Sequence, residues 1–500
     1  MMRLTSPWRF FVDADERGCA RIAAAGAKFL HKLLLRSPRE SHFKSASIRV
    51  QDKAAGIAAV LALVMSVGVV QAETIAIVHA QAWTMTGADG GKIDDATIVI
   101  RDGRYDSVRA GGATPAGARV IDAAGRVVTP GLMSGDTQLG LVEVSSLDET
   151  RDAGVDSGPL GAAFDVQYGL NANSVLLPSV LADGLTRAVT SPTGASDAAL
   201  RGIGAVVRII PGGDILDRAQ AALYASIGGG QAKKGGGSRA AQWQLLRNAF
   251  EEAKTYAPKP GAGPRDQLQN ALNIAALRGA LDRHMTLVMQ ADRESDIRQA
   301  VRLADDYHLP LVVLGGAEAW RCAELLAAHK AAVVVDPEAD LPFNFDGLGA
   351  RADSAALLQR AGVTIAFAVS GNTVYLSHNA GSAVREGAGL AVANGLPYAE
   401  ALKALTANPA RMFGIADHYG SMAAGLDADL VVWNADPLEP SSAPDLVLMR
   451  GVEASRVTRQ TLLRDRYAPR QAPVGSAAKE VPLGDAPKAA SSMLPPAYRD

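Results

Sequence analysis

Polar side chains follow the apolar, strand-like runs in the central part of this 500-residue chain. Two of their carboxylates, Asp136 and Asp292, could together hold a hard cation or act as a general base. His378 stands between a serine and an asparagine and is the histidine best placed for proton transfer. Each residue also has a structural alternative, because Asp and Asn cap helices and satisfy loop backbone. The remaining candidates of this kind are Gln138, Glu143, Gln290, Glu318 and Asn372.

The elements that would position these residues alternate between apolar runs and helical patterns. Runs at residues 287–290, 311–314 and 332–335 are separated by helical periodicity at residues 297–306 and 317–328. This alternation is typical of parallel βα units, and its extent suits a (β/α)₈ barrel. A doubly wound open sheet fits the pattern almost as well. In a barrel, the candidate residues would gather at the carboxyl ends of the strands.

Short alternating strands are predicted on both sides of this central region. Strand patterns and turn residues indicate strands at residues 75–78, 96–101 and 104–109, and strand-rich sections return at residues 428–433 and 446–463. The glycine-rich segment at residues 228–238 is expected to form an exposed loop, followed by a helix at residues 240–256. It is not a phosphate-binding loop, because no Gly-Lys-Ser/Thr follows at the required spacing.

Several motifs carry a family resemblance. Residues 130–133 read Pro-Gly-Leu-Met and are followed by Leu139 and Gly140, while residues 406–410 follow the pattern Thr-x-Asn-Pro-Ala. Residues 420–433 follow Gly-Ser-x-x-x-Gly-x-Asp-Ala-Asp-Leu-Val-Val-Trp. Together these motifs resemble the amidohydrolase superfamily, in particular its imidazolonepropionase-like branch. The resemblance covers roughly residues 73–467 and implies a TIM-type (β/α)₈ barrel with a small β-sandwich built from N- and C-terminal segments.

The resemblance also implies where a metal would be held. Relatives bind zinc or another divalent metal through His-x-His on strand one, histidines on strands five and six, and an aspartate on strand eight, and such a metal lowers the pKa of bound water to about 7. Gln and Asn offer only neutral oxygens, which are poor ligands for zinc. We therefore expect no high-affinity zinc site and no other cofactor. The corresponding residues here are Asp136, Gln138, Gln290, Gly315 and Asn372.

The N-terminal sequence predicts export. An apolar run at residues 56–70 ends before an A-x-A-like cleavage site, so residues 50–72 are predicted to be a signal peptide and the protein to be periplasmic. The run is too short for a stable membrane span. Residues 1–49 form a basic extension, and we expect translation to start near Val50; the alternative is that these residues are a genuine long leader. Cleavage would remove Cys19 and leave Cys322 as a buried small hydrophobe.

The predicted domain organisation follows from these patterns. The barrel occupies residues 129–414, the two parts of the β-sandwich occupy residues 73–128 and 415–467, and residues 468–500 form a disordered tail rich in Pro and Ala. The net charge of -2 gives no reason to expect nucleic acid as a partner. The expected partners are a small-molecule ligand or substrate and a related amidohydrolase, in a homo- or hetero-oligomer.

Two functions are compatible with these observations. The first is an exported hydrolase of non-peptide C–N bonds, of the cyclic amide type, with an altered or metal-poor site. The second is a catalytically inactive pseudoenzyme whose barrel binds a ligand or an intact relative. The barrel alone does not distinguish them, because one fold hosts many functions.

Overall fold

The computed structural model describes residues 74–468, with gaps at 145, 156–157, 194–198, 230–236, 256–267, 343 and 370–379. These residues belong to one unit of the chain, Ala72–Asp500. The predicted basic extension and signal peptide, and residues 469–500 of the predicted tail, lie outside the described residues. Within the described part, none of the helices has the length and apolar character needed to cross a membrane.

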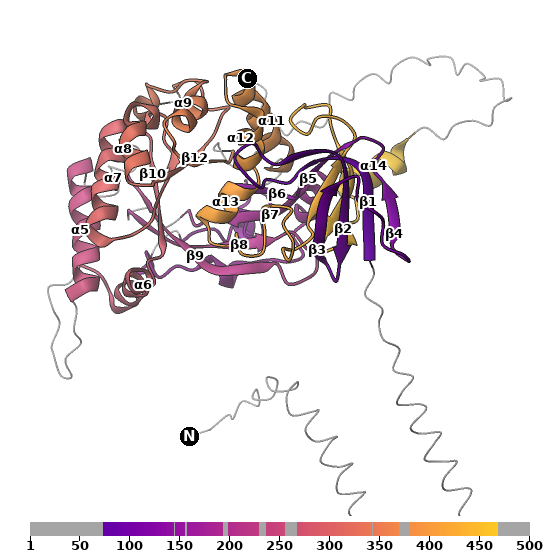
Figure 1. Ribbon diagram of the computed structural model, residues 1–500. Helices are drawn as coiled ribbons and strands as arrows, with labels where there is room; N and C mark the ends of the chain where they lie inside the picture. Colours follow the sequence, from indigo (N-terminus) through magenta and orange to yellow (C-terminus); the bar gives the residue numbers. More distant parts are fainter. Residues whose placement is uncertain are drawn as a thin grey trace, which may run out of the picture. The chain divides into compact units, whose positions relative to one another are not determined.

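Eight strands form the central sheet (Figure 1). In chain order they are β6 (Leu132–Thr137), β7 (Leu185–Thr190), β8 (Leu200–Arg208), β9 (Leu216–Ser226), β10 (Thr286–Ala291), β11 (Leu311–Gly315), β12 (Ala332–Val335) and β13 (Ile365–Phe367). Each strand pairs with the next along the chain, and contacts between β13 and β6 bring the two edges together. The barrel expected from the sequence is confirmed in preference to the open sheet.

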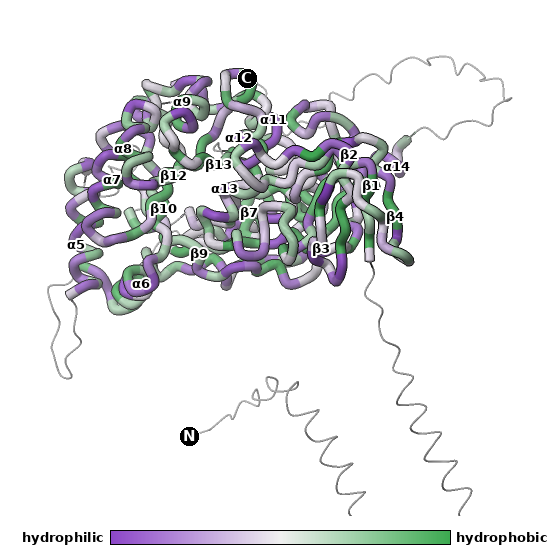
Figure 2. Tube along the Cα trace, viewed as in Figure 1, coloured by the Kyte–Doolittle hydropathy of each residue, from purple (hydrophilic) through white to green (hydrophobic). Residues whose placement is uncertain are grey.

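Helices follow most of the strands, and most of these helices cover the outside of the barrel. They are α3 (Leu177–Ala182), α5 (Arg239–Thr255), α6 (Ala271–Asp282), α7 (Glu294–Tyr307), α8 (Ala323–Ala328), α9 (Ser354–Arg360), α11 (Ala380–Ala393), α12 (Tyr398–Ala404) and α13 (Ala407–Met412). The predicted helix after the glycine-rich loop is α5. Purple and green alternate along α5, α7 and α8 in Figure 2, as expected for helices that bury one face.

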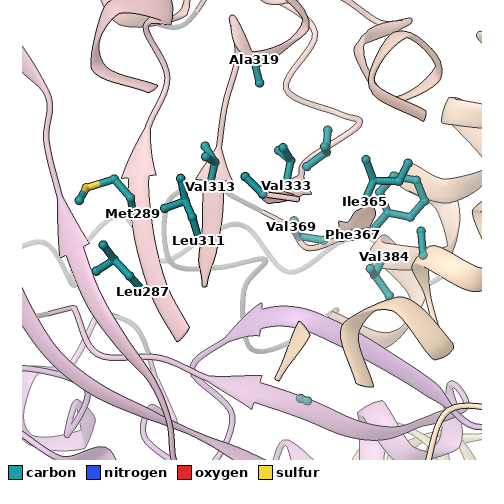
Figure 3. Packing of buried hydrophobic residues seen from close by; sticks show 14 of the residues in the cluster. Leu287, Met289, Leu311, Val313, Ala319, Val333, Ile365, Phe367, Val369 and Val384 are labelled. Atoms are coloured by element: carbon teal, nitrogen blue, oxygen red, sulfur yellow. The ribbon is translucent and has the colours of Figure 1, made fainter. Parts of the chain in front are cut away.

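Successive residues of the strands point to opposite sides of the barrel wall. Leu287, Met289, Leu311 and Val313 belong to the large cluster that packs between strands and helices (Figure 3). The residues between them, including Val288 and Val312, belong to a separate cluster inside the barrel. This alternation explains the near-continuous apolar runs of the sequence, because both faces of each strand are buried.

One strand departs from the regular (β/α)₈ pattern. β8 runs antiparallel to both β7 and β9, and neither connection contains a helix in its described residues. Antiparallel neighbours need only a short connection, whereas parallel neighbours need a crossover. The reversal places Leu200, at the beginning of β8, beside Ala225, near the end of β9. The first residues of β8 therefore lie at the same end of the barrel as the last residues of β7 and β9.

The N- and C-terminal segments join in a second sheet. Its strands are β1 (Thr74–Trp83), β2 (Lys92–Arg101), β3 (Arg104–Ala110), β4 (Arg119–Asp122), β5 (Val127–Pro130), β14 (Leu430–Trp433), β15 (Pro444–Met449) and β16 (Val452–Glu453). The junction is the antiparallel pair β5–β14, in which Thr129 lies opposite Val431. The strands pair as one mixed sheet around its own apolar cluster. Since β5 belongs to this sheet, the barrel begins at β6.

The strand-rich section predicted at residues 446–463 extends only as far as β16. A helix, α14 (Arg459–Tyr467), follows in its place. Thr458 and Thr461 form a capping box, in which each side chain accepts a hydrogen bond from the backbone N–H of the other residue. Such a cap satisfies two N–H groups that a helix start leaves without partners, and this local chemistry favours the helix.

Barrel and sheet are held together by a buried ion cluster around Arg187. Arg187 lies on β7 and is fully buried; its Nε donates to Asp217 Oδ2 at 2.8 Å. Its Nη1 donates to Asp429, and its Nη2 lies 3.4 Å from Asp427. The last two carboxylates come from the Asp-Ala-Asp of the family motif. These motif residues therefore serve the junction between the two sheets.

Replacing Arg187 with Leu should destabilise the fold strongly, because it leaves buried carboxylates without their cation. The expected loss in the free energy of unfolding is about 3–5 kcal/mol, measured by urea denaturation. The matched control is Arg104→Leu, which removes a half-exposed arginine 3.8 Å from the same Asp427. The control should cost about 1 kcal/mol or less. Equal losses in the two variants would contradict the central role of Arg187.

Candidate site at the carboxyl end of the barrel

Three neutral side chains occupy the inner positions at the ends of β9, β10 and β11. Ser226, Gln290 and Leu314 lie side by side in the strand register. They follow Tyr224, Val288 and Val312 by two residues, and those three belong to the inner cluster. By the two-residue period, the three neutral side chains also face the inside of the barrel. Gln290 is exposed there.

The predicted strand-six ligand position has no room for a side chain. Gly315 ends β11 with φ of 90°, in the region that favours glycine. A Cβ atom added to Gly315 would lie 2.6 Å from Oδ1 of Asp292, which is closer than atoms in contact normally approach. A histidine could therefore stand at position 315 only if both the backbone and Asp292 moved.

Asp292 takes part in loop structure at this end of the barrel. Its Oδ1 accepts a hydrogen bond from Ala317 N at 3.4 Å, and it borders a cavity of about 50 Å³ together with Asp336 and Arg351. Burial raises the pKa of Asp292, and the charges of Asp346 and Glu318 add to this effect. The residues that shift the pKa of Asp136 are different ones, Ser191 and Arg201. The structure thus gives the two predicted carboxylates separate surroundings.

The other predicted residues are placed as follows. Gln138 follows β6, is half-buried, and its carbonyl accepts hydrogen bonds from Leu141 N and Val142 N at the start of the next turn. Asn372 and His378 lie outside the described residues. Cys322 is buried, as predicted, and burial raises the pKa of its thiol to about 11.

Asp136, which is half-buried, stands in a polar cluster that the structure assembles at the ends of four strands. Its carboxyl, on β6, interacts with the hydroxyl of Ser191, which follows β7. The charges of Arg201 on β8 and Asp136 influence each other, and Asp136 also influences the hydroxyl of Tyr224 on β9. We call Asp136, Ser191, Arg201 and Tyr224 the mouth cluster. Arg201 can join it because β8 is reversed.

Three polar atoms of the mouth cluster are buried without a hydrogen-bond partner among the described residues. They are Oδ1 of Asp136, Nε of Arg201 and the hydroxyl of Tyr224. Arg201 is held in place by its Nη1, which donates to the carbonyl of Thr193 at 2.8 Å. Buried polar groups normally find partners, because an unsatisfied one costs about 1–3 kcal/mol. Three such groups in one cluster make it the candidate site for a polar ligand.

Burial dominates the electrostatics of the mouth cluster. It raises the pKa of Asp136 to about 7, although Ser191 and Arg201 both oppose the shift. It lowers the pKa of Arg201, which Asp136 opposes, and it raises the pKa of Tyr224. An acid whose pKa lies near neutrality can both accept and donate a proton at working pH. The arrangement is therefore suited to proton transfer next to two hydrogen-bond donors.

Arg201, Tyr224 and Ser191 were not among the residues predicted from the sequence. Tyr224 lies within an apolar run, where an aromatic residue is normally a core residue. Arg201 gives a clearer signal, since it is a charged residue near the start of a glycine-containing apolar strand. Gly204 is needed there, because a Cβ atom at its position would lie 2.5 Å from the ring of Tyr224.

Among the described residues, the donor set does not fit the zinc centre implied by the family resemblance. Within the described ranges, no group of three or more His, Cys, Asp or Glu side chains is arranged to hold a metal ion. At the strand ends, Ser226, Gln290 and Leu314 offer neutral or apolar groups, and position 315 has no side chain. Zinc in proteins is bound by thiolate, imidazole and carboxylate.

Comparisons with known proteins agree with the fold. Residues 246–461 match the family model described as "Amidohydrolase family". Amidohydrolase tasK from Hapsidospora irregularis is 46% identical over 57 residues, which are 11% of this chain and 6% of that protein. The chain thus matches only a small part of that relative's length.

Solved structures extend the likeness to most of the chain. The structure of an amidohydrolase from Thermotoga maritima has a TM-score of 0.67 and 24% sequence identity, and the match covers 77% of this chain and 100% of that chain. N-isopropylammelide isopropylaminohydrolase from Burkholderia multivorans gives a TM-score of 0.44 at 16% identity, over 76% of this chain and 98% of that chain.

Stability should depend on pH through Asp136. Because its pKa is raised from 3.8 to about 7, the folded protein at about pH 5 keeps a proton that the unfolded chain has lost. The free energy of unfolding should therefore fall as the pH rises from about 4 to about 8. Asp136→Asn removes this dependence. The free energy of unfolding of the variant should therefore exceed that of the natural protein by an amount that grows with pH, to on the order of 4 kcal/mol.

Urea denaturation at about pH 5 and about pH 8 measures this difference. The control is Asp148→Asn, whose side chain is 93% exposed and which should change stability equally at both pH values. If the effect of Asp136→Asn is the same at the two pH values, Asp136 is not a buried acid of the kind described.

Proposed function

Because the chain belongs to the amidohydrolase superfamily, we propose that it hydrolyses a C–N bond of a small amide at the mouth cluster, without the family's zinc centre. The observation that carries this proposal is the set of three buried atoms without partners, on Asp136, Arg201 and Tyr224. Together they offer one acceptor and two donors. An amide, with an N–H beside a C=O, matches that pattern.

The proposed chemistry follows from the positions of these groups. The carboxylate of Asp136 takes a proton from a water molecule, and the resulting hydroxide attacks the carbonyl carbon of the amide. Arg201 and Tyr224 donate hydrogen bonds to the oxygen on which negative charge develops. Asp136 then gives its proton to the departing nitrogen as the C–N bond breaks, leaving a carboxylic acid and an amine. Asp136 thus accepts and returns the same proton, as a group with a pKa near neutrality can do.

The second candidate function is a binding protein without catalysis. The neutral row at Ser226, Gln290 and Leu314 favours it, because these positions supply no group for acid–base chemistry. In this version the mouth cluster binds the amide, and the barrel acts as a ligand-binding or partner-binding subunit alongside an intact relative. Both versions share the same site and differ only in whether bound ligand is turned over.

Two further features belong to the proposal. The signal sequence at residues 50–72 directs export of the protein to the periplasm. In the periplasm, a related amidohydrolase would be its partner. Within the superfamily, the Pro-Gly-Leu-Met and Thr-x-Asn-Pro-Ala motifs support the imidazolonepropionase-like branch, whose resemblance points to cyclic amides.

Asp136→Asn should lower turnover of a cyclic amide by about 100-fold or more, because it removes the proton-transfer group. Hydantoin is a suitable probe, with ring opening followed by NMR in the presence of a chelator. Asp292→Asn is the matched control and should retain activity, because Asp292 has separate neighbours. Activity that survives in Asp136→Asn, or that the chelator abolishes, would refute the metal-free mechanism. Binding without any turnover would instead establish the pseudoenzyme.

Restoring histidines should create metal affinity. The natural protein is expected to purify without stoichiometric zinc, whereas Asp136→His combined with Gln138→His and Gln290→His should bind it, because imidazole is a preferred zinc ligand. Elemental analysis after dialysis against zinc measures the change. Position 315 is left as glycine, since a side chain there would meet Asp292. Zinc retained by the natural protein in equal amount would contradict the loss of the metal centre.

A further inference from the structure

We propose that the amino-terminal end of the barrel holds a second binding site, for a small molecule that joins a phosphate or sulfonate group to an apolar body. The site is a pocket of about 570 Å³. It is bordered by the first residues of β10, β11 and β12, by the first half of β9 and by the end of α13. It therefore lies at the opposite end of the strands from the mouth cluster.

The pocket is strongly basic. Five basic residues border it, and no Asp or Glu does: Arg218, Arg283, His284, Lys330 and Arg411. Several clustered cations of one sign attract an anion, and guanidinium groups suit phosphate geometry. A pocket of this volume lies within the range of small-molecule sites.

Within the described residues, carboxylates do not neutralise these cations. None of the three arginines, nor Lys330, forms a salt bridge within the part of the chain that the structure describes. Arg218 donates to the carbonyl of Gly414 at 2.9 Å, and Arg283 donates to the carbonyl of Gly279 at 2.9 Å. Arg411 lies 3.4 Å from the side-chain oxygen of Asn408. Asp417 feels the charge of Arg218 but does not border the pocket.

The inner part of the pocket is apolar. Val312, Ala332 and Phe413 border it and belong to the cluster that fills the inside of the barrel. A ligand that enters between the basic side chains would therefore place its charged group among them and its apolar body against the end of the barrel core. Burial of the apolar body adds to the attraction between charges.

The backbone keeps two of these basic residues in an uncommon conformation. His284 follows α6 with φ of 48°, and Lys330 follows α8 with φ of 54°. Glycine adopts this conformation most easily at a helix end, and Gly362, with φ of 84°, does so after α9. Basic residues occupy the pocket positions even though glycine would be less strained. The dipole of a helix also favours cations at its carboxyl end. A direct measurement of anion binding separates this effect from a binding site.

Isothermal titration of the full-length protein with phenyl phosphate tests the proposal. Phenyl phosphate should bind with one site per chain, inorganic phosphate at least about tenfold more weakly, and phenol more weakly still, because each lacks one part of the ligand. Arg283→Gln combined with Arg411→Gln should weaken binding of phenyl phosphate by about tenfold or more. Arg302→Gln, an exposed arginine on α7 away from the pocket, is the matched control and should leave binding unchanged.

Two further variants distinguish binding in this pocket from binding at the mouth cluster and from a loss of folding. Lys330→Gly should relieve backbone strain, so it should keep or raise the melting temperature while weakening phenyl phosphate binding. Arg201→Gln alters the mouth cluster and should leave this binding unchanged. The proposal is overturned if phenyl phosphate does not bind, if the pocket variants and Arg302→Gln behave alike, or if Arg201→Gln alone abolishes binding.

Discussion

The ion cluster around Arg187 is the interaction on which the arrangement of the protein depends. One guanidinium on β7 meets carboxylates from β9 and from the segment before β14, so it joins the barrel wall to the sheet formed by the two ends of the chain. Burial raises the pKa of Asp429, while Arg187 favours its charged form. A buried charge of this kind is stable only when an oppositely charged group pairs with it. The two sheets are therefore fixed by a set of charges that must be assembled together.

The sequence predicted those parts of the fold whose signal is local. Apolar runs alternating with helical periodicity predicted parallel βα units. The choice of a closed barrel over an open sheet, and the joining of the two terminal strand sections, came from the family resemblance. The reversal of β8 left no signal, because an apolar strand reads alike in both directions. α14 was missed because its start depends on two threonine side chains rather than on an apolar face, since none of its residues is buried.

The candidate site was predicted less completely, for the same reason. Asp136 was found because it follows a recognisable motif, but its neighbours Arg201 and Tyr224 come from parts of strands that would not be searched for strand-end residues. The loss of space at Gly315 depends on a backbone angle and on the position of Asp292, neither of which the residue types reveal. Strand-end motifs can locate the mouth of a barrel, whereas the three-dimensional arrangement determines which side chains meet there.

Because β8 is reversed, the segments before and after it lie at opposite ends of the barrel. The described residues just before β8, 191–193 and 199, lie at the mouth of the barrel, and the turn that leads out of β8, at residues 209–215, lies at the far end. A change of length in the outgoing turn would alter the end of the barrel that holds the basic pocket, and Arg201 would stay in place. A shift of Thr193, whose carbonyl accepts a hydrogen bond from Arg201, would move the guanidinium itself. Evolution could thus retune one end of this hairpin while holding the other constant.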